Sequence, residues 1–328
     1  TTQKYKAVCK VRSRVRFALT GTPVENRLGE LWSIFSFLMP GYLPPYKSFC
    51  SRFEKPIVQE EDQTAVRRLN QLTGPFILRR MKSDVLKELP PKTENVYRIE
   101  LEEEQRKLYL AAVVDAREKL QAAKPEDKMA VFAVLMRLRE ICCDPRLIAD
   151  NWEGGSAKLD ACVELVSSAV EGGHRILLFS QFTSMLELLA KRLDAEGISH
   201  FTLQGSTPKP VRAELVRRFN GGEVSVFLIS LRAGGTGLNL TAADIVIHYD
   251  PWWNVAAQNQ ATDRAYRIGQ QNPVQVYKLI AQDTIEEKIV ELQQAKQSLA
   301  DTVTGTADGA ILSMRPDELL QLLEGSEP

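Results

Sequence analysis

From Lys158 onward, short apolar runs alternate with amphipathic stretches along the chain. The apolar runs predict buried strands at Arg175–Ser180, His200–Leu203, Val224–Ser230, Ile245–Tyr249 and Val274–Ile280. Between them, apolar residues recur at helical spacing and predict helices at Ser184–Glu196, Val211–Asn220, Val255–Arg267 and Thr284 to about Ala300. Strands rich in Val, Ile and Leu that alternate with helices are typical of a parallel sheet with helices on both faces. We therefore expect an α/β domain of RecA-like or Rossmann-like type.

The first half of the chain has a less regular pattern. Arg14–Leu19 reads as a short buried strand that ends in a turn at Thr20–Pro23. From about Asn26 to Leu89, helical stretches are interrupted by Pro-Gly, Pro-Pro and Gly-Pro pairs, which favours a helical insertion over a continued sheet. Asn95–Leu101 then alternates like a strand, and two helical patterns follow it.

Composition narrows the class of protein. The 328 residues, 44% hydrophobic and 26% charged, are typical of a soluble globular protein with more than one domain. No apolar run is long enough to span a bilayer, and no leader pattern opens the chain. The five cysteines form no C-x-x-C pair and the three histidines are far apart, so no metal site is predicted and a reducing, cytoplasmic location is expected.

The formal net charge is zero, so any nucleic-acid site must be a local face of the molecule. The first sixteen residues carry six Lys and Arg and no acid. A solvated basic stretch explains that segment equally well.

Two arginines are the first candidates for chemistry. Gln260, Arg264 and Arg267 are separated by four and three residues, which would place them on one face of the predicted helix. Neighbouring guanidinium groups repel each other unless an anion lies between them, and the terminal phosphates of a nucleotide would suit their planar donors. Surface ion pairing is the alternative, since Asp263 precedes Arg267 by four residues.

The stretch Gln260–Gln270 closely resembles the last helicase motif of the SWI/SNF-type DNA translocases of helicase superfamily two. In that family both arginines act as fingers on the γ-phosphate of ATP held by the other lobe, which implies this role for Arg264 and Arg267. Tyr266 stands where the commonest family version has His.

A glycine-rich loop follows the predicted strand Val224–Ser230. Glycines let backbone N–H groups approach a phosphate or ribose, although a tight turn would also explain them. The loop resembles the family motif that touches both the nucleotide and the DNA backbone. By resemblance, Arg232 would contact DNA. The residues implied in nucleotide binding are Gly234, Gly235, Gly237, Asn239 and Gln260.

Two further blocks and the run Tyr249–Asn254 extend the resemblance over nearly the whole chain. Thr20, Gly21 and Thr22 resemble the third motif, which couples the ATP site of the first lobe to DNA. Phe179–Phe182 resembles the first motif of the second lobe, where Ser180 and Gln181 would face the DNA backbone. By family alignment Trp253 approaches the DNA minor groove, or it is a core residue.

Two motifs of the intact family are not found in this sequence. Walker A requires a Gly-Lys pair, and none of the 19 glycines is followed by Lys. The single Asp-Glu pair, Asp317–Glu318, lies in a predicted helical tail, so the acidic motif that holds Mg²⁺ is not found either. In the family both precede the third motif. We therefore expect a truncated motor that does not hydrolyse ATP alone, with ATP and Mg²⁺ bound mainly by a first lobe.

The family comparison divides the chain into five expected segments. They are a remnant of the first RecA-like lobe (1–30), a helical insertion and linker (31–95), a strand with a helical subdomain (96–155), the second RecA-like lobe (156–300) and a C-terminal helical tail (301–328). The expected function is the C-terminal half of an ATP-dependent translocase on double-stranded DNA. The alternative is a non-catalytic DNA-binding or protein-interaction module. A Rossmann oxidoreductase is excluded because no G-x-G-x-x-G opens the first βα unit.

Overall fold

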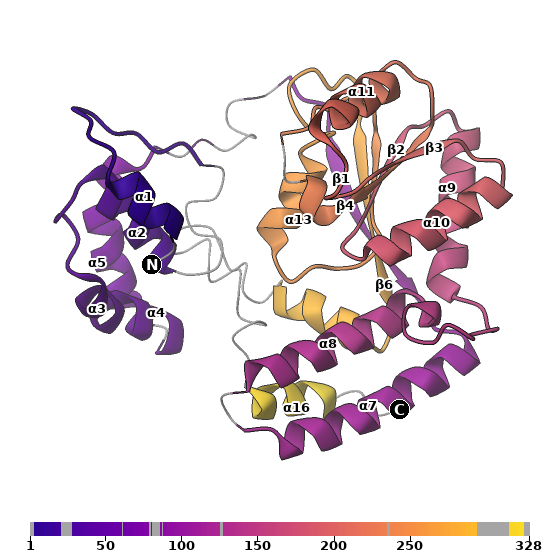
Figure 1. The fold of residues 1–328 in the computed structure, drawn as a ribbon, viewed down its shortest axis with the longest axis horizontal. Helices are drawn as coiled ribbons and strands as arrows, with labels where there is room; N and C mark the ends of the chain where they lie inside the picture. Colours follow the sequence, from indigo (N-terminus) through magenta and orange to yellow (C-terminus); the bar gives the residue numbers. More distant parts are fainter. Residues whose placement is uncertain are drawn as a thin grey trace. The chain divides into compact units, whose positions relative to one another are not determined.

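The structure, a computed structural model, describes residues 3–20, 28–60, 62–78, 80, 86, 88–124, 127–234, 237–293 and 315–324. The chain forms two compact units (Figure 1). The first comprises Thr1–Val85 with Gln293–Gly309, and the second comprises Leu86–Leu292 with Ala310–Pro328. Each unit has a hydrophobic core of its own. None of the described helices is both long and apolar enough to cross a membrane.

The regular secondary structure in the described part of the first unit is helical. Its helices are α1 (Gln3–Cys9), α2 (Leu28–Leu38), α3 (Tyr46–Phe49), the π-helical turn η1 (Cys50–Glu54), α4 (Lys55–Gln59), α5 (Gln63–Thr73) and the 3₁₀ turn η2 (Gly74–Phe76). Leu31, Phe35, Phe49 and Leu69 form the centre of the core. The helical character expected between Asn26 and Leu89 is confirmed for these elements.

The predicted strand Arg14–Leu19 is wrong. Residues 11–20 are irregular, with Phe17 82% exposed and Leu19 fully exposed. A strand needs a hydrogen-bonded neighbour, and the described residues of this unit contain no strand that could pair with this segment. Arg14–Leu19 therefore has the apolar pattern of a strand but no partner strand among the described residues of this unit.

The second unit is built on a six-stranded parallel sheet in the order β1-β6-β5-β2-β4-β3, which confirms the predicted α/β fold. The strands are β1 (Lys92–Ile99), β2 (Ile176–Ser180), β3 (His200–Leu203), β4 (Val226–Ser230), β5 (Ile245–His248) and β6 (Val274–Ala281). β2, β4 and β5 are buried at every position. Strands covered on both faces are expected to be continuously apolar.

Helices cover both faces of this sheet (Figure 1). Alternate residues of β2 point to opposite faces, so Leu178 packs with one set of helices and Phe179 with the other. The first face is covered by α9 (Ala157–Glu171) and α10 (Thr183–Ala195). The second is covered by α11 (Lys209–Asn220), α12 (Leu231–Gly234) and α13 (Val255–Thr262).

The sheet begins earlier than the predicted lobe boundary at residue 156. β1 pairs in parallel with β6 along its whole length, from Lys92 beside Val274 to Ile99 beside Ala281. A boundary after residue 95 would cut through this strand. β1 is an edge strand whose first seven residues are exposed, so no buried apolar run marks where it starts.

A helical layer completes the second unit. It contains α7 (Glu103–Ala122), α8 (Lys128–Cys143), the short turn η3 (Pro145–Leu147), a helix at 285–293 and α16 (Pro316–Glu324). Figure 1 shows α16 lying along α7 and α8. Leu319 and Leu323 of α16 are fully buried in the same core as Tyr109 and Leu135. α16 is therefore part of this layer.

Candidate functional site

The glycine-rich loop and the two arginines lie together in the structure. After β4 the chain forms α12, and the described part of the following loop starts at Gly237. The backbone N–H of Leu240 donates to the carbonyl oxygen of Arg264 at 3.0 Å. The Nη1 of Arg267 donates to the carbonyl oxygen of Leu238 at 3.1 Å. Two segments predicted to bind the nucleotide are thus held against each other.

The arginines do not share one helical face with Gln260. α13 ends at Thr262, and the chain continues through tight turns in which the N–H of Ala265 and that of Tyr266 both donate to the carbonyl of Thr262. Gln260 is exposed, whereas Arg264 is 8% exposed. The turns bring Ala265 into the core of the sheet, which a straight continuation of the helix did not predict.

Arg264 lies in an electrostatically unfavourable place. Burial lowers the pKa of its guanidinium, the positive charge of Arg267 lowers it further, and Asp263 offsets only part of the two effects. Two neighbouring cations, one of them buried, are a site that an anion would stabilise.

Gln270 anchors this segment, a role that the sequence pattern did not reveal. Its Nε2 donates to the carbonyl oxygens of Ala243 at 2.7 Å and Ala265 at 3.1 Å. Its Oε1 accepts from the N–H groups of Gln271 and Asn272, both at 2.9 Å. Gln270 was visible in the motif, but a surface glutamine and a buried anchor look the same in a sequence.

The loop after β2 is less exposed than its predicted DNA contacts require. Ser180 is 1% exposed, and its Oγ accepts from the N–H of Phe182 at 3.1 Å. The side-chain amide of Gln181 is buried, and neither Oε1 nor Nε2 finds a hydrogen-bond partner among the described residues. A buried amide without partners is costly, so this side chain is one that would gain from reaching a new partner. Ser180 presents no surface to a ligand in this arrangement.

Trp253 is a core residue in this structure. It is 4% exposed, its ring lies 4.1 Å from that of Trp252 between centroids, and Phe132 of α8 meets it edge-on at 5.9 Å. The groove contact predicted for Trp253 is therefore corrected in favour of the core alternative. Arg232, by contrast, is exposed on α12.

The remaining predicted residues are placed as follows. Gly237 is exposed with φ of +50°, in the left-handed region that favours glycine. The carbonyl of Asn239 accepts from Nδ2 of Asn220 at 2.8 Å. Gly234 ends α12, and Thr20 is exposed in the first unit. Gly21, Thr22 and Gly235 lie outside the described residues.

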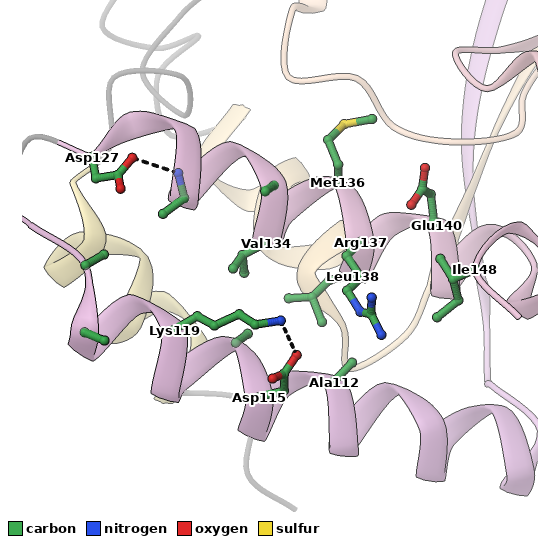
Figure 2. A pocket seen from close by; sticks show the side chains of 15 residues that line it. Ala112, Asp115, Lys119, Asp127, Val134, Met136, Arg137, Leu138, Glu140 and Ile148 are labelled. Atoms are coloured by element: carbon green, nitrogen blue, oxygen red, sulfur yellow. Dashed lines mark hydrogen bonds and ion pairs between the residues drawn. The ribbon is translucent and has the colours of Figure 1, made fainter.

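A separate groove of about 650 Å³ lies between α7 and α8 (Figure 2). Alanines such as Ala112 and Ala116 line it together with Val134 and Leu138, and the Lys119–Asp115 ion pair lies beside it. None of the residues that line it belongs to the predicted sites.

Comparison with known proteins identifies the family of the chain. Two family models match the chain, the SNF2-related domain over residues 1–147 and the helicase conserved C-terminal domain over 157–269. The fold and these motifs define a helicase-like ATPase domain. The chain belongs to the SWI/SNF family of such ATPases.

The SWI2/SNF2 ATPase core of Sulfolobus solfataricus in complex with dsDNA is a similar solved structure, with a TM-score of 0.62 and 34% identity over 98% of this chain and 69% of that one. An uncharacterized ATP-dependent helicase of Mycoplasma genitalium is 39% identical over 97% of this chain and 31% of its own length. The putative ATP-dependent helicase/translocase YwqA of Bacillus subtilis is 40% identical over 98% and 36%. The chain thus spans about a third of these curated relatives.

Proposed function

We propose that this chain is the C-terminal part of an ATP-dependent translocase on double-stranded DNA. Arg264 and Arg267 would stabilise the γ-phosphate of an ATP molecule that the first RecA-like lobe holds with Mg²⁺. The observation that carries the proposal is the buried Arg264 beside Arg267, with the glycine-rich loop bonded to both. Closure of the lobes on ATP and reopening after hydrolysis would move the protein along DNA.

The chemistry assigned to these arginines is charge stabilisation in the transition state. Guanidinium groups keep their charge even when partly buried, so they can approach the transferring phosphoryl group without losing a proton. Because the 328 residues contain no Walker A motif, we do not expect the chain alone to hydrolyse ATP, with or without DNA.

The decisive experiment uses a full-length protein that includes an ATP-binding lobe. Arg264→Ala or Arg267→Ala should lower DNA-stimulated turnover by roughly 10³- to 10⁵-fold and change ATP affinity far less. Arg217→Ala is the matched control, because Arg217 is an exposed arginine on α11 paired with Glu214. Equal losses of ATP binding and of turnover would make the two arginines ground-state ligands.

The proposed DNA face combines exposed Arg232 with Gln181, and Trp253 is no longer part of it. Arg232 supplies a charge for a phosphate, and the Gln181 amide supplies a polar group that gains a partner if it turns outward. Turnover that did not respond to duplex DNA in the full-length protein would favour the protein-interaction alternative.

A further inference from the structure

Arg139 of α8 is a buried cation that none of the recognised motifs explains. It is fully buried, and its Nη2 donates to Oδ2 of Asp250 at 3.2 Å and to the carbonyl oxygen of Pro251. Three aromatic rings lie around the guanidinium. Its carbon Cζ is 4.9 Å from the ring centroid of Trp253, 5.5 Å from that of Trp252 and 5.6 Å from that of Phe182. Both partners of the ion pair have side chains with no exposed surface.

Such a pair is poorly explained as a source of stability alone. Removing two charges from water costs about as much as their attraction returns, and apolar replacements of the same shape are often as stable. The pair instead fixes the orientation of Asp250. A forked guanidinium that is held between a carboxylate, a carbonyl and aromatic rings can adopt few orientations.

Asp250 connects Arg139 to the loop after β2 through hydrogen bonds. Its two carboxylate oxygens accept from the backbone N–H of Gln181 at 3.2 and 3.3 Å. The Ser180 hydroxyl also hydrogen-bonds the same carboxylate. β2 and β5 are neighbouring parallel strands, so the loops that leave their carboxyl ends meet at this aspartate. Arg139 is the contribution of the helical layer to this edge of the sheet.

We propose that Arg139 is a positioning residue that fixes Asp250 and, through it, the backbone at Gln181. The inference rests on the proposed function for its biological meaning, because Gln181 is assigned to DNA there. Arg139 itself touches no DNA. It determines where the loop that does so is held.

Hydrogen exchange of single backbone amides tests the positioning directly and needs no DNA. In Arg139→Met the protection of the Gln181 amide should fall at least tenfold relative to the native chain. The Ile176 amide, which donates to Ser225 at 2.9 Å at the other end of β2, is the internal control and should change far less. Unchanged protection at Gln181 in a folded Arg139→Met chain would overturn the proposal.

If Arg139→Met alone does not fold, the double variant Arg139→Met with Asp250→Asn keeps the question open to measurement. It leaves no buried charge without a counter-ion, and the Asn side chain can still accept from Gln181. The double variant should fold and show Gln181 protection between that of the native chain and that of a denatured reference. Full native protection in the double variant would contradict a role for Arg139.

Duplex binding measured by fluorescence anisotropy adds the functional readout. Arg139→Lys keeps the charge but not the fork, and we expect it to weaken binding about three- to tenfold without changing the salt slope. In a Gln181→Ala background the same substitution should have little further effect. Additive losses, or a slope lowered by about one, would mean that residue 139 acts on phosphate directly and would overturn the proposal. Absence of DNA binding by the native chain would refute the proposed function, and amide exchange would still decide the positioning.

Discussion

At the scale of single residues, the chain buries two arginines in opposite surroundings. Arg139 has a carboxylate, a carbonyl and three aromatic faces around it. Arg264 has a second cation, Arg267, close enough to lower the pKa of its guanidinium beyond what burial does. In the first arrangement the buried charge is already paired with a carboxylate. The second places two positive charges close together, an arrangement that an anion between them would stabilise.

This contrast predicts that the same substitution has very different effects on the free energy of unfolding at the two positions. Arg139→Met should lower the free energy of unfolding by about 3–5 kcal/mol, because it leaves Asp250 as a buried charge without its partner. Arg264→Met should leave the free energy of unfolding within about 1 kcal/mol of the native value or raise it, because it removes like-charge repulsion. Urea unfolding of the two variants would measure both values. A large loss of stability in Arg264→Met would contradict the assignment of that site to an anion.

His248 provides a prediction for pH. It lies in β5 with Nε2 2.9 Å from Oγ1 of Thr262, and burial, helped by Lys278, lowers the pKa of its imidazole to about 3. The unfolded chain protonates this residue near pH 6.5, so the unfolded state binds the extra proton first as pH falls. The stability associated with neutral His248 is therefore complete above pH 6.5 and is lost between pH 6.5 and about 3.

The matching experiment follows the free energy of unfolding of the native chain and of His248→Gln over this pH range. The variant should lack a component of the pH dependence whose slope is at most about 1.4 kcal/mol per pH unit. Identical pH profiles would show that the imidazole is not kept neutral by the fold.

At the scale of secondary structure elements, α16 tests whether the end of the chain belongs to the second unit. Leu319 and Leu323 are four residues apart and fully buried, and the carbonyl of Leu323 accepts from Nη2 of Arg117 at 3.0 Å. Leu323→Ala should destabilise the second unit by about 2–5 kcal/mol, as deletion of a buried leucine side chain does. Exposed Gln321→Ala should change stability by less than about 0.5 kcal/mol. Similar small effects of both variants, measured by thermal unfolding, would mean that α16 does not pack as described.

The elements also show what local pattern can predict. The bounds of β2 to β6 were predicted to within about two residues, because buried parallel strands have continuously apolar sequences. The strand predicted at Asn95–Leu101 is confirmed as β1, but its start was placed three residues late because an exposed edge strand has no apolar run to mark it. The end of α13 at Thr262 was missed because Arg264, Ala265 and Arg267 still fit helical spacing after the helix has ended.

The candidate site was predictable to the extent that it is local in sequence. The motifs that contain Arg264, Arg267 and the glycine-rich loop are each short and continuous in the sequence, so they were recognised there. The structure brings them together. The sequence left two positions open for Trp253, the DNA groove and the core, and it did not predict the Arg139–Asp250 pair. Arg139 and Asp250 are 111 residues apart, and no pattern within one element specifies which distant side chain will supply a counter-ion.

At the scale of the whole molecule, the zero net charge sets the kind of DNA binding to expect. Long-range attraction is weak, so affinity should come from a few local phosphate contacts and should show little sequence preference. Arg232→Ala should weaken binding to two unrelated duplexes alike and lower the salt slope by about one. Salt titrations by fluorescence anisotropy would measure both quantities. A large preference for one duplex, or binding independent of salt, would be incompatible with backbone contacts.

The pairing of β1 with β6 has a consequence for how the chain is made. β6 is the only strand beside β1 in the described sheet, and their paired residues are about 180 positions apart in the sequence. During synthesis β1 leaves the ribosome before the other strands of the sheet. It cannot pair until nearly the whole second unit, including β6, has been made. At ordinary synthesis rates this delay is roughly 10–40 s, during which an extended segment with Val96 and Tyr97 is open to other chains. A chaperone that covered this segment during synthesis would keep it from pairing with other chains before β6 is made.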